Sequence, residues 1–188
     1  MADGTLLGLC GALRAGSYNR RLMHEAAKRF SPATFAEGDL RLPLYDGDLE
    51  EAEGVPGSVK ALADSIAAAD AVIISSPEYN KSLSGVLKNA LDWISRVDHK
   101  PFLNKPVAIM SATAGRTGGE VAQNALRLAL VSFGPRLLLG PHVLVASAPD
   151  QFDGATLTNA VNAKALNQLM ANLREAAGLQ ALPTEAAA

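Results

Sequence analysis

A loop of small and polar residues, Gly11–Asn19, is the first stretch whose residue types could do chemistry. It lies between a short apolar run and a helical pattern, so it joins a predicted strand to the start of a predicted helix. The first turn of a helix leaves backbone N–H groups unpaired, and the helix dipole favours an anion there. The side chains that could add hydrogen bonds and charge around phosphate oxygens are Arg14, Ser17 and Asn19.

The glycine spacing of this loop excludes two common phosphate sites. A P-loop requires lysine and then serine or threonine after its last glycine, whereas Gly16 is followed by Ser17 and Tyr18. Gly8, Gly11 and Gly16 do not match the Gly-x-Gly-x-x-Gly dinucleotide fingerprint. The loop therefore favours the phosphate of a mononucleotide. The alternative is an ordinary strand-to-helix turn in which Ser17 caps the helix.

A second loop with binding chemistry follows the apolar run Ala71–Ser75. Pro77 stiffens the turn off that strand, Tyr79 offers a flat apolar face with a polar tip, and Asn80 offers donors and an acceptor. A planar, partly polar ring system would fit against such a loop. The alternative is a plain connection between a strand and a helix.

The hydrophobic pattern alternates between short apolar runs and amphipathic segments. The apolar runs predict strands at Leu6–Cys10, Thr34–Glu37, Ala71–Ser75 and Val107–Met110. A last strand is predicted from Leu137–Leu139 and Val143–Val145, which Gly140-Pro141 interrupts. The amphipathic segments predict helices at Tyr18–Phe30, Val59–Ala69, Leu83–Val97, Glu120–Val131 and Leu157–Ala177. Between them, Leu40–Gly57 is predicted to be a long loop.

This alternation predicts an α/β fold, a doubly wound five-stranded parallel sheet with helices on both faces. The chain shows no repeat and no linker, so we expect one domain over residues 1–188, with residues 181–188 as a loose tail. Parallel strands end at one edge of their sheet, where ligands bind. The polar loops expected to meet there are Gly11–Asn19, Ser76–Ser84 and Ser111–Gly119.

Two of these loops carry a family resemblance. Gly11–Asn19 resembles the GSLRxGSxN loop of the NADPH-dependent FMN reductase family, and Pro77–Trp93 resembles its PEYNxSxPGxLKNAIDW block. Two positions depart from these motifs. Ala12 replaces a serine, which removes one hydroxyl from the phosphate loop, and Ser84 replaces a proline, which loosens the entry to the following helix.

The resemblance implies a flavodoxin-like fold, a bound FMN and NAD(P)H as co-substrate. It implies that the FMN phosphate is held by Arg14, Ser17 and Asn19. It implies that the flavin ring is lined, largely through backbone groups, by Pro77, Glu78, Tyr79 and Asn80, and that the site is closed by Ser111 and Gly115. Further residues considered for the substrate are Arg116 and, from a neighbouring subunit, Arg96 and Lys100. The alternative for Arg116 is an exposed arginine without a binding role, and the alternative for Arg96 and Lys100 is a solvated basic helix end that the helix dipole favours.

By this resemblance the chain is an FMN-dependent NAD(P)H oxidoreductase that passes hydride through the flavin N5 to quinones and, as a further acceptor, chromate. The flavin does the chemistry, so we assign no catalytic side chain. No Gly-x-Ser-x-Gly elbow is present, and the three histidines, His24, His99 and His142, show no metal-ligand spacing.

Three other functions stay open. One is a reductase that releases reduced FMN to a partner monooxygenase. Another is a non-enzymatic flavodoxin-type electron carrier, which is disfavoured because such carriers are strongly acidic, whereas this chain has a net charge of −2 and an arginine in its phosphate loop. The last is a flavin-free scaffold.

Composition bounds the location and the partners. A net charge of −2 gives no electrostatic case for nucleic acid, and no apolar run approaches the roughly 20 residues of a membrane span. We expect no signal peptide, and the single cysteine, Cys10, fits a reducing compartment, so we expect a cytoplasmic protein. The family implies a homo-oligomer, a dimer or a dimer of dimers (a homotetramer), with Leu40–Gly57 and Leu83–Val97 as candidate interface elements.

Overall fold

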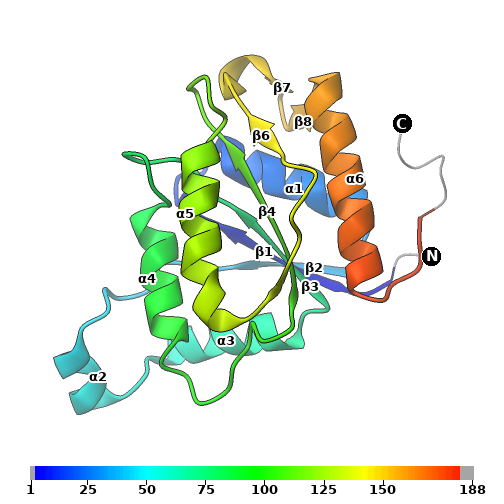
Figure 1. Cartoon of the computed structure of the whole chain (residues 1–188). Helices are drawn as coiled ribbons and strands as arrows, with labels where there is room; N and C mark the ends of the chain where they lie inside the picture. The colour runs from blue at the N-terminus through cyan, green and yellow to red at the C-terminus, as the bar shows by residue number, and fades with distance from the viewer. Residues whose placement is uncertain (1–2, 183–188) are drawn as a thin grey trace.

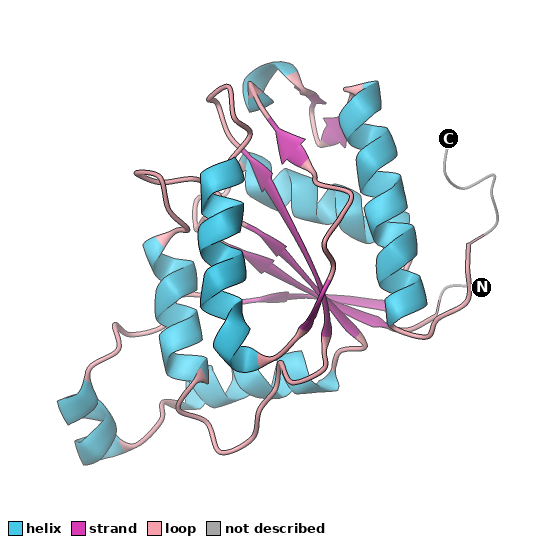
Figure 2. Ribbon diagram, in the orientation of Figure 1, coloured by secondary structure: helices cyan, strands magenta, loops and turns pink. Residues whose placement is uncertain are grey.

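A parallel β-sheet lies between two layers of helices in the computed structural model, which describes residues 3–182 (Figure 1; Figure 2). The sheet order is β2-β1-β3-β4-β5, and β6 also pairs with β4. The strands of this sheet are β1 (Thr5–Cys10), β2 (Thr34–Gly38), β3 (Ala71–Ser75), β4 (Pro106–Ala112), β5 (Arg136–Leu137) and β6 (Leu144–Val145). All of their pairings are parallel, which confirms the predicted fold class.

The helices are α1 (Tyr18–Phe30), α2 (Gly47–Glu53), α3 (Gly57–Ala68), α4 (Gly85–Ile94), α5 (Glu120–Leu130) and α6 (Ala160–Ala176). Apolar residues of α1 and α6 pack in one buried cluster, and those of α3, α4 and α5 pack in another. Neighbouring residues of β3 divide between the clusters, because Ile73 faces α1 and α6 whereas Val72 and Ile74 face the other layer. The fold is therefore doubly wound.

Two short strands, β5 and β6, pair with the same side of β4 and together form the edge of the sheet farthest from β2. β5 pairs with the first part of β4 through Leu137 and Val107, and β6 pairs with its last part through Val145 and Ala112. This arrangement confirms the predicted strand broken at Gly140-Pro141.

The predicted loop Leu40–Gly57 is wrong in part, because it contains α2. Asp46 caps this helix by accepting a hydrogen bond from the N–H of Asp48 at 2.9 Å. None of its residues is buried, so it has no apolar periodicity to reveal it. The segment before α2 lies along α4, where the indole N–H of Trp93 donates to the Pro43 carbonyl at 2.8 Å.

The final helix begins at Ala160, not at the predicted Leu157. Asn159 caps it through the N–H of Asn162 at 3.0 Å, and Leu157 belongs to a small antiparallel hairpin. The hairpin strands are β7 (Phe152–Asp153) and β8 (Thr156–Leu157). Of the predicted tail, residues 183–188 lie outside the described residues.

Ser84, where the sequence departs from the family motif, stands immediately before α4 and makes no side-chain capping bond. Its side chain is buried, and its Oγ is the one buried side-chain polar atom in the described part of the chain that lacks a hydrogen-bond partner. Such an atom destabilises a fold because it has lost its bonds to water. Its φ of −68° is the value that a proline ring imposes.

We therefore expect Ser84→Pro to stabilise the protein. Proline should add about 0.4–1 kcal/mol by restricting the unfolded chain, and loss of the unpartnered hydroxyl should add to this gain. Thermal unfolding would show a higher midpoint than that of the unsubstituted protein. Ser84→Ala removes the hydroxyl alone and separates the two contributions. A lower midpoint for Ser84→Pro would contradict the prediction.

Candidate functional site

The three polar loops predicted to converge do meet, and they enclose a cavity of about 520 Å³. They follow β1, β3 and β4, and the cavity lies at the carboxyl edge of the sheet. The strand order reverses between β1 and β3, which is the position where doubly wound sheets bind ligands. The cavity is lined by Ala12, Arg14, Ser17, Tyr18, Asn19, Pro77, Glu78, Tyr79, Lys81, Ala112, Thr113, Ala114, Gly115, Arg116 and Thr117.

Ser17 stands immediately before α1 and caps it. Its Oγ accepts hydrogen bonds from the N–H groups of Asn19 at 3.2 Å and Arg20 at 3.4 Å. Neither bond uses the hydroxyl proton, so Ser17 can cap the helix and still donate to an anion. Arg14, in the same loop, is exposed and also lines the cavity, and no acidic side chain pairs with it among residues 3–182.

The side-chain amide of Asn19 forms three hydrogen bonds within the protein. Its Nδ2 donates to the Ala112 carbonyl at 2.8 Å, and its Oδ1 accepts from the Ala112 N–H at 3.0 Å and from the Ser75 hydroxyl at 3.1 Å. These bonds join the start of α1 to the ends of β3 and β4. Asn19 therefore holds the loop after β1 against the ends of β3 and β4, and it also lines the cavity. The direct phosphate contact that the family resemblance implies for Asn19 stays a prediction.

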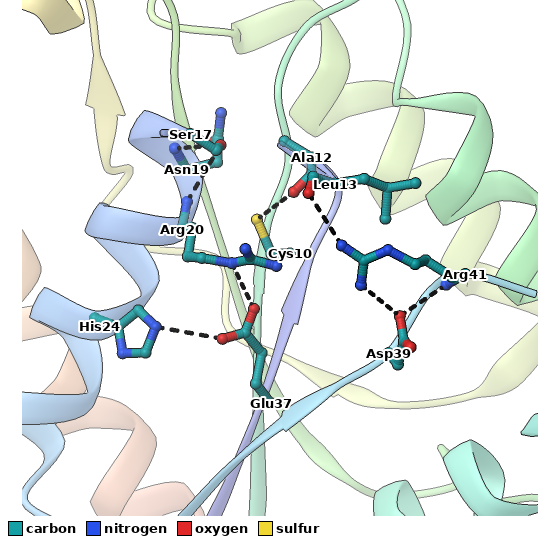
Figure 3. A network of polar contacts seen from close by, with 10 residues as sticks. All are labelled: Cys10, Ala12, Leu13, Ser17, Asn19, Arg20, His24, Glu37, Asp39 and Arg41. Carbon is teal, nitrogen blue, oxygen red and sulfur yellow. Dashed lines mark hydrogen bonds and ion pairs between the residues drawn. The ribbon is translucent and has the colours of Figure 1, made fainter. Parts of the chain in front are cut away.

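The outer side of the phosphate loop rests on the end of β2 and the segment after it (Figure 3). Arg41 donates to the Leu13 carbonyl at 3.3 Å and pairs with Asp39, and Glu37 of β2 pairs with Arg20 at 2.7 Å. Beneath the loop, the thiol of Cys10 donates to the Ala12 carbonyl at 3.4 Å, and burial raises its pKa. Cys10 is therefore a buried, protonated side chain, as expected for a small apolar core residue.

The loop after β3 forms a tight turn from Tyr79 to Ser82. The backbone groups of these two residues exchange N–H···O bonds of 3.1 Å in both directions. Asn80 and Lys81 occupy the turn with φ of 50° and 62°. This left-handed backbone conformation is uncommon for residues other than glycine, and asparagine tolerates it better than most. The turn leaves Tyr79 half-exposed at the cavity, whereas Asn80 lies outside the cavity lining.

The loop after β4 is shaped from below by Ser111. This residue is fully buried, and its hydroxyl donates to the Gly118 carbonyl and accepts from the Gln123 Nε2 at 2.9 Å. A Cβ on Gly119 would lie 2.8 Å from the Ser111 side chain, so this approach requires glycine. Ser111 thus supports the loop, while Gly115 lines the cavity.

Two predicted substrate residues, Arg96 and Lys100, do not line the cavity. Both follow α4, whereas the loop that borders the cavity precedes it. Arg96 pairs with both carboxylate oxygens of Glu50 in α2 at 3.0 Å. Within one subunit they are therefore separate from the site, and a role for them requires a neighbouring chain.

Sequence reasoning did not single out several residues that shape the site. Tyr18 and Lys81 line the cavity, and Gln123 supports the third loop from α5. The sequence does carry a signal for Gln123, which is a polar residue between Ala122 and Leu126 on the apolar face of a helix.

The geometry fits FMN. The cavity is lined by Arg14, which has no acidic partner within residues 3–182, by Ser17 at the N-terminus of α1, and by the turn that carries Tyr79. Its volume is within the range of about 300–1,000 Å³ for cofactor sites. In residues 3–182, no group of three potential metal ligands comes together, and no helix is both long enough and apolar enough to cross a membrane.

Comparison with known proteins agrees with this geometry. Residues 5–150 match the family model described as NADPH-dependent FMN reductase. An NAD(P)H-dependent FMN reductase of Pseudomonas aeruginosa is 44% identical over 80% of this chain and 82% of its own length. A quinone reductase of Escherichia coli is 38% identical over 79% of this chain and 80% of its own length.

Among solved structures, the flavoenzyme NAD(P)H:(acceptor) oxidoreductase FerB of Paracoccus denitrificans superposes with a TM-score of 0.83 at 29% identity. The match covers 95% of this chain and 100% of that one. The motifs around Arg14 and Pro77, the flavodoxin-like sheet order and the matched length agree: this chain belongs to the NADPH-dependent FMN reductase family.

Proposed function

We propose that this chain is an FMN-dependent NAD(P)H oxidoreductase that passes hydride through bound FMN to quinones. The observation that carries this proposal is that the loop after β1 and the turn that carries Tyr79 line one and the same cavity. The relatives named FMN reductase and quinone reductase support it. A third relative, at 40% identity over 62% of this chain, is a 2-hydroxy-1,4-benzoquinone reductase of a Burkholderia species.

In this proposal the protein binds FMN and orients it, and no side chain acts as a nucleophile. Arg14, the Ser17 hydroxyl and the positive end of α1 hold the phosphate, and the segment from Pro77 to Tyr79 borders the ring. Bound FMN supplies the redox chemistry, in which NAD(P)H is oxidised and a quinone is reduced to a hydroquinone with a further proton from water. Asn19 and Ser111 position the loops.

Chromate is a second acceptor that we propose for the same cavity. Two cationic side chains besides Arg14 line it, Lys81 and Arg116, and they would attract a small oxyanion. Arg96 and Lys100 contribute only if a neighbouring subunit brings them to the cavity. If Arg96→Ala leaves chromate kinetics unchanged while Arg116→Ala raises KM, Arg96 has no such role.

We propose that the chain assembles as a dimer or a dimer of dimers. An apolar groove lies between the segment before α2 and the start of α4, and it includes Leu42, Pro43, Leu44 and Val86. Leu44 is 81% exposed in a single chain, and further exposed apolar residues lie on α5 at Leu128 and after it at Val131. Light scattering coupled to gel filtration measures the assembly. A cytoplasmic location, which fits a chain whose single cysteine, Cys10, is buried and has no intrachain disulfide partner, completes this proposal.

Arg14→Ala should weaken FMN binding by about 10- to 100-fold, because a hydrogen bond to a charged group contributes about 1.5–3 kcal/mol. Titration of FMN-free protein, followed by quenching of flavin fluorescence, gives the dissociation constant. Lys60→Ala on α3, outside the cavity lining, is the matched removal of an exposed cation. Equal affinity of the Arg14 variant and the Lys60 variant would remove Arg14 from the phosphate site.

Rapid mixing of the FMN-loaded protein with NADH or NADPH tests the reaction itself. We expect bleaching of the flavin absorbance and its recovery when a quinone is added. A flavin that stays oxidised in both mixtures would identify an electron carrier. Loss of reduced flavin from the protein before the quinone reacts would identify a reductase that exports reduced FMN.

A further inference from the structure

The carboxylate of Glu78 reaches from the loop after β3 to the first turn of α5. Its Oε2 accepts hydrogen bonds from the backbone N–H groups of Val121 at 3.1 Å and Ala122 at 3.2 Å. The Glu78 side chain is only 11% exposed, and its bond from Ala122 is partly buried, whereas its bond from Val121 lies at the surface. Glu78 therefore caps a helix that belongs to another loop of the cavity.

The start of α5 needs such a cap from outside. The residue before the helix is Gly119, which has a φ of 91° and no side chain to offer. A capping serine or aspartate cannot replace it, because a Cβ there would lie 2.8 Å from Ser111. The close packing of Gly119 on Ser111 thus leaves no room for a capping side chain at the start of α5. The carboxylate of Glu78, at the positive end of this helix, acts as the cap.

The other oxygen of Glu78 faces its own loop. Its Oε1 lies 3.6 Å from the Nζ of Lys81, which occupies a left-handed position in the tight turn. The same turn presents Tyr79 to the cavity. One carboxylate therefore links the turn beside the proposed ring site to the helix that follows the third loop.

We propose that Glu78 is a positioning residue for the flavin: it fixes two walls of the cavity relative to each other before FMN binds. This inference rests on the proposed function only for the identity of the ligand. Without the cap, the N–H groups of Val121 and Ala122 lose their partners and the two loops separate more readily. FMN must then order the loops as it binds, which lowers its affinity.

The test compares Glu78→Ala, Glu78→Gln and the unsubstituted protein. Hydrogen exchange on FMN-free protein should show faster exchange at Val121 and Ala122 in Glu78→Ala. FMN titration of the same variant should show at least about tenfold weaker binding. Glu78→Gln keeps an oxygen that can accept both N–H bonds, so it should restore most of the protection and most of the affinity.

Glu120→Ala is the matched control, because Glu120 is an exposed carboxylate in the first turn of the same helix and lies outside the cavity lining. It should leave FMN affinity unchanged. Unaltered exchange in Glu78→Ala would overturn the capping role, and unaltered FMN affinity would overturn the positioning role. A Glu78→Gln protein as defective as Glu78→Ala would also overturn it. If the unsubstituted protein bound no FMN, the proposed function would fail, while the exchange measurement would still test the cap.

Discussion

The carboxamide of Asn19 is the interaction on which the site depends. It lies at the start of α1, is almost fully buried, and bonds to Ala112 at the end of β4 and to Ser75 at the end of β3. A buried amide that lost these partners would be costly, so the phosphate loop can adopt its shape only when both strand ends are in place. The parallel register satisfies this condition, because Cys10 pairs with Ser75 and Ser75 with Met110.

That register also explains how three separate loops come to border one cavity. Three neighbouring parallel strands end close together, and each continues into a loop that leads to a helix. The helices leave toward different faces, α1 into one layer and α4 and α5 into the other. The loops consequently diverge from the sheet and leave a cavity between them, while the two cores below keep the strand ends fixed.

The sequence was sufficient for the sheet and for the location of the cavity, because both follow from apolar runs and from the position of polar loops after them. It was insufficient where a structure depends on distant partners. The helix α2 buries no residue and left no periodic signal. Asn19 and Glu78 line the cavity as the sequence predicts, but the supporting hydrogen bonds that these two residues and Ser111 make were not predicted. Residue type shows that such side chains form hydrogen bonds, but only the fold shows that their partners include Ala112, Val121 and Gly118.

The two helix starts at the cavity are capped in different ways, and the difference gives the cavity a direction. α1 is capped by the neutral hydroxyl of Ser17 and has Arg14 beside it, so its positive end still favours an anion. At α5 the carboxylate of Glu78 already occupies the corresponding position and neutralises it. Of the two helix starts, only that of α1 therefore keeps an unneutralised positive end, which is the kind of end that favours an anion. In the proposed FMN complex, the carboxylate that joins two walls of the cavity would therefore also direct the phosphate toward α1 and away from α5.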